Sequence, residues 1–85
     1  MILNKENVSV ASATRTIFFI DKGAVYILAD VQGSFAFVPT VTVFDYRYKG
    51  KKRNTVIESA IRNHEVHCVE TYAEMFTVLK NNGLL

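Results

Sequence analysis

The sequence contains few of the residues that build disulfide-rich, collagen-like or low-complexity proteins. It has one cysteine, one proline, four glycines and no tryptophan among its 85 residues. The single cysteine, Cys68, excludes an internal disulfide framework and favours a reducing compartment. The low glycine and proline content excludes a repetitive chain. Because tryptophan is missing, the six phenylalanines must supply most of the core volume.

Long hydrophobic runs are missing as well. The longest lie at residues 17–20 and 24–29, and Asp21-Lys22-Gly23 separates them. Neither approaches the roughly 20 residues of a membrane-spanning helix. Residues 1–7 lack the charged and apolar regions of a secretory signal and are a candidate flexible start. We therefore expect a cytoplasmic protein with no membrane partner.

The residues that are present predict one small α+β domain over residues 1–85. Val, Ile, Thr, Phe and Tyr dominate residues 8–48, and these residue types favour strands. We expect strands near 14–20, 24–31, 34–38 and 40–48, joined as an antiparallel meander. A three-residue turn at 21–23 and a second turn at 32–33 separate the first three strands. A helix, a short strand at 66–69 and a second helix follow, and we expect both helices to pack on one face of the sheet.

Two capping boxes mark the expected helix starts. Thr71-Tyr72-Ala73-Glu74 and Thr55-Val56-Ile57-Glu58 both have the form in which the threonine hydroxyl accepts from the amide three residues later. Gly83 is expected to end the second helix in the left-handed conformation. Strand and helix periodicity together predict a core of Phe18, Ile20, Val25, Ile27, Phe37, Ile57, Ile61, Phe76 and Leu79.

No pattern in the sequence indicates catalysis, a metal or a cofactor. His64, His67 and Cys68 lie close together, but odd spacing along a strand points neighbouring side chains to opposite faces. No second cluster completes the four ligands that zinc requires. We expect His64 on an exposed turn, His67 on the strand surface and Cys68 in the core. The sequence therefore predicts a protein that is not an enzyme and has neither catalytic residues nor a cofactor.

The stretch 33–38, Gly-Ser-Phe-Ala-Phe-Val, resembles the aromatic strand with which cold-shock domains stack bases. That resemblance implies that Phe35 and Phe37 lie on one strand face, either buried in the core or exposed for stacking. Ser34 interrupts the family's pattern and no basic residue precedes Gly33, so we assign no family.

A basic segment is the feature closest to function. Five Lys and Arg residues fall between positions 47 and 53, whereas the rest of the chain carries five more against eight Asp and Glu. Such a concentration is typical either of a solvated connection whose lysines protect an edge strand from aggregation or of a site for an anionic partner, most readily the phosphates of DNA or RNA. Strand alternation puts Tyr46 and Tyr48 on one face together with Thr40, Thr42 and Phe44, and the two tyrosines can add base stacking or sugar contacts. The candidate binding residues are Tyr46, Arg47, Tyr48, Lys49, Lys51, Lys52 and Arg53.

Two classes of function follow from these observations. The first is a nucleic-acid-binding protein that uses the basic segment. The second is a protein-binding accessory factor, such as a phage-type inhibitor or regulator of a host enzyme, which docks through a sheet edge or a helix face. Its partner would carry an acidic patch where it meets the basic segment. An exposed sheet edge would also allow a homo-oligomer.

Overall fold

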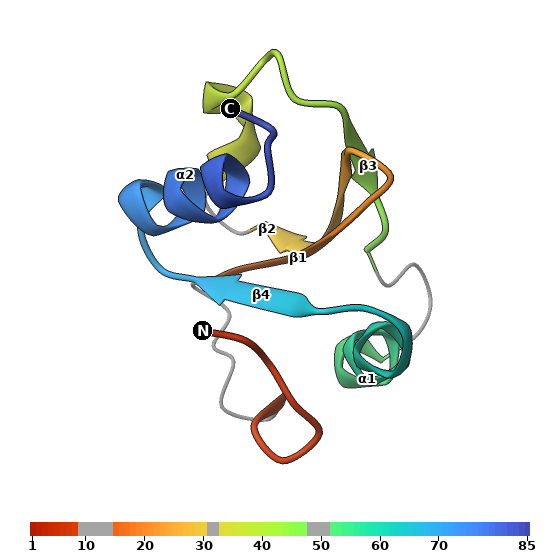
Figure 1. Cartoon of the computed structure of the whole chain (residues 1–85). Helices are drawn as coiled ribbons and strands as arrows, with labels where there is room; N and C mark the ends of the chain where they lie inside the picture. Colours follow the sequence, from red (N-terminus) through yellow and green to blue (C-terminus); the bar gives the residue numbers. More distant parts are fainter. Residues whose placement is uncertain (9–14, 31–32, 48–51) are drawn as a thin grey trace.

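The computed structural model describes residues 1–8, 15–30, 33–47 and 52–85 (Figure 1). These residues form a small α+β domain with two α-helices, as the sequence predicts, but with four strands instead of the five expected. The elements in chain order are β1 (Thr16–Asp21), β2 (Ala24–Asp30), a 3₁₀ helix (Ser34–Phe37), β3 (Val43–Asp45), α1 (Arg53–Asn63), β4 (Val66–Val69) and α2 (Tyr72–Asn81).

The sheet is mixed, with the strand order β3-β2-β1-β4. Strand β1 lies at the centre and pairs antiparallel with both β2 and β4, whereas β3 runs parallel to β2. The predicted meander is therefore wrong from its third strand onward. A parallel pair requires a crossover connection, and Phe35, Val38 and Val41 of this connection pack in the same core cluster as α2.

A short 3₁₀ helix replaces the predicted third strand. Gly33 takes a left-handed conformation with φ 63°, which turns the chain away from the sheet at the helix start. The Ser34 amide donates to Asp30 Oδ1 at 2.8 Å, and the Ser34 hydroxyl lies 3.1 Å from Thr16 Oγ1. These buried bonds fold the segment back over the strand ends. The aromatic strand implied by the cold-shock resemblance is consequently absent from residues 34–37.

The turn between β1 and β2 contains two residues rather than the predicted three. Asp21 pairs with Ala24, and both intervening residues have positive φ, 51° at Lys22 and 77° at Gly23. Two successive positive φ values are the requirement of a type I′ hairpin turn.

The two α-helices cover opposite faces of the sheet, as Figure 1 shows. Ile57 and Ala60 of α1 pack with Phe19 of β1 in one core cluster. Met75 and Leu79 of α2 pack with Phe18 in the other. Adjacent residues of a strand point to opposite faces, so β1 supplies both clusters. The prediction that both helices pack on one face is therefore wrong.

Most of the predicted core is buried, with two exceptions. Phe18, Val25, Ile27, Ile57 and Leu79 are buried, and Ile20 and Ile61 are partly buried against the two clusters. Phe37 is 61% exposed, because it ends the 3₁₀ helix instead of alternating along a strand. Phe76 is 37% exposed, because α2 buries the neighbouring stripe of Met75 and Leu79.

The two helix starts differ. Thr71 caps α2 as predicted, since its side chain accepts from the Glu74 amide at 3.2 Å. The cap of α1 is Lys52 and not Thr55, which lies inside the helix. The predicted capping box at Thr55 is therefore wrong. Gly83, with φ 74°, follows α2 in the left-handed conformation, as expected.

Residues 1–3 run antiparallel along the outer edge of β4. The Leu3 amide donates to the Val66 carbonyl at 2.8 Å, and the Cys68 amide donates to the Met1 carbonyl at 2.8 Å. Ile2 forms a bridge with His67. In the described part of the chain, neither helix has the length and apolar character needed to cross a bilayer.

Candidate functional site

Four stacked rings form a row across the α1 face of the sheet. Sheet register aligns Phe19 with Tyr26, and Tyr26 with Phe44. The ring centroids are 4.9 Å apart in the first pair and 5.2 Å in the second, and His64 stacks on the far side of Phe19 at 4.0 Å. We call His64, Phe19, Tyr26 and Phe44 the aromatic row. Its successive interplanar angles of 11°, 4° and 27° make it a nearly parallel stack.

Within the aromatic row, the exposed fraction of the rings increases from β1 to β3. Phe19 is only 3% exposed, whereas Phe44 is 49% exposed. Tyr46 follows β3, is 53% exposed and stands nearly perpendicular to both Phe19 and Tyr26, at 73° and 77°. Its amide donates to the Ile27 carbonyl at 2.8 Å, which fixes its backbone against β2. Two half-exposed rings, Phe44 and Tyr46, therefore lie at the β3 edge of the sheet.

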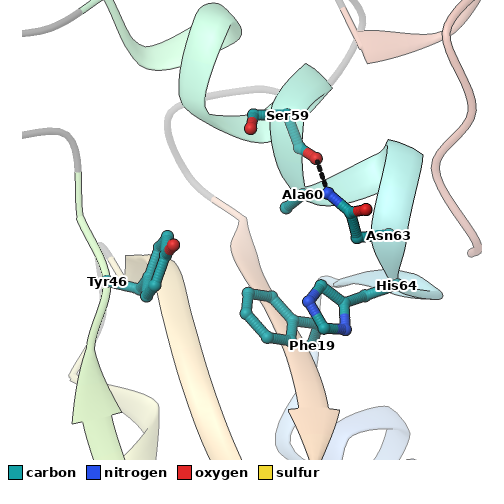
Figure 2. A pocket seen from close by; sticks show the side chains of 6 residues that line it. All are labelled: Phe19, Tyr46, Ser59, Ala60, Asn63 and His64. Atoms are coloured by element: carbon teal, nitrogen blue, oxygen red, sulfur yellow. Dashed lines mark hydrogen bonds between the residues drawn. The ribbon is translucent and has the colours of Figure 1, made fainter.

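A hollow of about 200 Å³ separates Tyr46 from α1. Thr55, Val56, Ser59 and Arg62 line the helix side, and we call this space the Tyr46 hollow. Their spacing follows one stripe of the helix surface. A polar recess of about 40 Å³ adjoins it, sharing Tyr46 and Ser59 (Figure 2).

Figure 2 shows Tyr46 on one side of this recess and Asn63, His64 and Phe19 on the other. The Asn63 side-chain amide donates to the Ser59 carbonyl at 3.2 Å, which holds the amide group against the last turns of α1. The recess therefore has an aromatic wall and fixed polar groups.

The basic segment leads from this aromatic edge into α1. Lys52 is the exposed cap of the helix and Arg53 is its first residue. Arg47 forms an ion pair with Asp45, with Nε 2.9 Å from Oδ1 and Nη2 3.1 Å from Oδ2. The positive charge of Arg47 is thus already matched by a carboxylate. Tyr48, Lys49 and Lys51 lie outside the described residues.

Comparisons of the chain with protein-family models, with curated proteins and with solved structures return no match.

His67 and Cys68 are buried, and His64 is half-buried. His67 is 9% exposed and stacks on Phe18 at 5.4 Å, so its predicted place on the strand surface is wrong. Burial lowers the pKa of His67 below its ordinary 6.5, although the nearby Glu65 carboxylate opposes the shift. His64 is half-buried against Phe19, not on an exposed turn. Cys68 is buried as predicted, and burial raises the pKa of its thiol.

Burial limits the chemical reactivity of Cys68 on β4. A buried neutral thiol is a poor nucleophile, because the thiolate is the reactive form. Within residues 1–8, 15–30, 33–47 and 52–85, no group of three His, Cys, Asp or Glu side chains is arranged to hold a metal ion.

A second exposed aromatic patch lies on the opposite side of the molecule. Phe37 contacts Tyr72 with ring centroids 5.0 Å apart, and Phe76 lies one helical turn after Tyr72. Their exposed fractions are 61%, 39% and 37%. Phe35 instead packs edge-on against Phe18 in the core. Within the 33–38 stretch, Phe35 is therefore buried in the core, whereas Phe37 is exposed.

Tyr46 is the one candidate binding residue from the sequence that lines the hollow, whereas the α1 stripe that faces it was not predicted. Ser59 and Arg62 gave no signal, because a serine and an arginine on a helix are ordinary surface residues. The alternation that puts Phe44 and Tyr46 on one face is confirmed, since both contact Tyr26. The aromatic row was detectable in principle from the alternating positions of Phe19 and Tyr26 on neighbouring strands.

Proposed function

We propose that this protein binds single-stranded nucleic acid through the surface formed by Phe44, Tyr46 and the basic start of α1. The observation that carries the proposal is the pair of half-exposed rings on the β3 edge of the sheet, directly before the basic segment. Exposed aromatic rings on a rigid surface stack with bases, and neighbouring Lys and Arg neutralise phosphates.

The geometry favours a single strand over a duplex. In a duplex the base faces are covered by neighbouring bases, so protein rings cannot stack on them without unstacking. The rings of Phe44 and Tyr46 project from a sheet edge and offer their faces to unstacked bases. Base stacking is worth roughly 1–3 kcal/mol per base and tolerates many sequences. We therefore expect binding with little sequence preference.

The phosphate contribution is tested by removing charge in two matched places. One variant carries Lys51→Gln, Lys52→Gln and Arg53→Gln. The control carries Lys5→Gln, Lys22→Gln and Lys80→Gln, and both variants have three fewer positive charges than the unchanged protein. We expect the first variant alone to bind an oligonucleotide more weakly. Its slope of log K against log salt should be flatter by about 0.7 for each phosphate that the protein no longer neutralises.

Equal slopes for the two variants would mean that only net charge matters. Absence of salt-sensitive binding by the unchanged protein at low ionic strength would overturn the proposal.

The stacking contribution is tested at Tyr46. Tyr46→Leu retains an apolar side chain but removes the ring face, and we expect roughly tenfold weaker binding, a decrease of about 1.4 kcal/mol in binding free energy. Tyr46→Phe keeps the ring and should bind almost as well as the unchanged protein. Circular dichroism of both variants controls for folding, since Tyr46 contacts Phe19 and Tyr26.

The exposed patch of Phe37, Tyr72 and Phe76 favours a second candidate function, docking of a protein partner on the α2 side. Aromatic residues are enriched at the centres of protein interfaces. A photo-crosslinking residue at position 37 should then capture one partner in the native host. With the crosslinker kept at position 37, Tyr72→Ser together with Phe76→Ser should abolish the crosslink, whereas added salt should weaken it only slightly. Capture that disappears only in the basic-segment variant would instead indicate a partner with an acidic patch.

A further inference from the structure

The Tyr46 hollow has the size and the lining of a site for one nucleobase. Its volume of about 200 Å³ is below the roughly 300–1,000 Å³ of pockets that enclose whole drug-sized ligands. It combines one aromatic wall, an apolar side chain, two hydroxyls and a cation from Tyr46, Val56, Thr55, Ser59 and Arg62. These are the groups that recognise a flat heterocycle with polar edges and an attached phosphate.

We propose that this hollow receives one unstacked base of the bound strand, an inference that rests on the proposed function. Tyr46 stands across the aromatic row instead of joining it, so one side of its ring borders the space in front of α1. A base in this space stacks on Tyr46 and meets Val56 on the opposite side. The hydroxyls of Thr55 and Ser59 then lie along the polar edge of the base.

Arg62 gives the hollow a positive end. Arg62 is exposed on the last turn of α1 and lines the hollow together with Ser59. A guanidinium in this position binds the phosphate attached to the inserted nucleotide. The adjoining recess, with a volume of about 40 Å³ and the Asn63 amide, accommodates an exocyclic oxygen or amino group of the base.

Thr55, which lines the hollow, lies in the first turn of α1, directly after the basic start of the helix at Lys52 and Arg53. A strand that enters the hollow with one base therefore has neighbouring phosphates near these cations. A free mononucleotide has no such neighbouring phosphates. We accordingly assign the hollow to a base of a strand and expect thymidine monophosphate to bind at least tenfold more weakly than an oligonucleotide.

The experiment fills the hollow with a larger protein side chain and, separately, removes the bases from the oligonucleotide. Ser59→Leu adds a larger side chain to an exposed helix position that lines the hollow. Thr77→Leu makes the same kind of change on exposed α2 and is the matched control. Each protein is titrated with an oligothymidylate of about eight nucleotides and with an abasic oligomer of equal length and charge.

In the unchanged protein and in Thr77→Leu, we expect base removal to weaken binding by tenfold or more. In Ser59→Leu, the penalty for base removal should be about tenfold smaller, because the leucine already occupies the place of the inserted base. The salt slope should be the same in the unchanged protein and in Thr77→Leu, and at most about 0.7 flatter in Ser59→Leu, where Arg62 loses the phosphate of the inserted nucleotide.

The outcomes separate this inference from the proposed function. If the oligothymidylate binds with the expected salt slope but Ser59→Leu leaves the base-removal penalty unchanged, the hollow holds no base and only the surface binding stands. If neither oligomer binds, both fail. If thymidine monophosphate binds as tightly as the oligomer, the hollow is a mononucleotide site and the assignment to a strand is overturned.

Discussion

Thr71 holds the start of α2 through one side-chain hydrogen bond. Its Oγ1 accepts from the Glu74 amide at 3.2 Å, which satisfies one of the amides that a helix start leaves without a helical partner. We expect Thr71→Ala to lower the free energy of unfolding by about 1 kcal/mol. In a domain of this size, that change moves the thermal midpoint by roughly 4–8 °C.

Thr55→Ala is the matched control for this prediction. Thr55 has the same capping-box sequence but lies inside α1, which begins at Arg53. Alanine favours helix interiors more than threonine does, so this change should be neutral or slightly stabilising. Equal decreases in stability for the two variants would contradict the assignment of Thr71, and not Thr55, as a helix cap.

His67 should make the stability of the protein depend on pH. Burial keeps the pKa of His67 below 6.5 in the folded protein, so the unfolded chain binds the proton more readily. The stability contribution of the neutral ring is complete above about pH 6.5. It is lost as the pH falls from there through the folded pKa.

Two measurements check this prediction. The ring resonances of His67 should titrate with a midpoint below 6.5 in folded protein. His67→Phe should unfold with a weaker dependence on pH between about 7 and 5, since the ring no longer gains a proton on unfolding. A midpoint above 6.5 would show that the Glu65 carboxylate outweighs burial.

Among the elements, the β1–β2 turn holds a residue that fits its conformation poorly. Lys22 has φ 51° and is followed by Gly23 at 77°. Asn-Gly is the preferred pair in a type I′ turn because asparagine tolerates positive φ. We expect Lys22→Asn to stabilise the domain by roughly 0.5 kcal/mol or more in urea unfolding.

Lys22→Val provides the opposite control for the turn. A β-branched side chain is strongly disfavoured at positive φ, so this change should destabilise the protein. If both substitutions shift the midpoint in the same direction, the turn does not have the positive φ values described.

The observed strands and helices also differ in how well the sequence predicts them. Local signals located β1, β2, β4 and α2, because alternation and capping depend only on neighbouring residues. The strand predicted over residues 34–38 is wrong because the Ser34 hydroxyl shares a buried hydrogen bond with Thr16, which is 18 residues earlier in the chain. Tertiary contacts of this kind override strand propensity.

The same distinction applies to the candidate site. The basic segment and Tyr46 are contiguous in sequence and were predicted from composition and spacing. The hollow depends on α1 lying opposite Tyr46, which follows from the parallel return of β3. The parallel direction of β3 beside β2 could not be deduced from local periodicity. The sequence therefore offered no reason to assign Ser59 and Arg62 to a site.

At the scale of the whole molecule, the four-stranded sheet of the described residues separates two hydrophobic core clusters. Strand β1 contributes Phe19 to the α1 side and Phe18 to the α2 side. Because neighbouring residues of one strand belong to both clusters, neither core can lose its packing without disturbing the strand shared with the other. The candidate site and the exposed Phe37 patch therefore stand on one connected framework.

This connection predicts that both cores unfold together. Ile57 is fully buried on the α1 side and Ile27 is 6% exposed on the α2 side. Ile57→Val and Ile27→Val should each cost roughly 0.5–1.5 kcal/mol and still fold. In urea titrations followed by methyl resonances, signals from both cores should disappear at one midpoint, and each substitution should lower that midpoint for both cores equally. If Ile57→Val shifted the α1-side signals alone, the two faces would be separate folding units. Unfolding of α1 would then remove the Tyr46 hollow while the α2 side stayed folded.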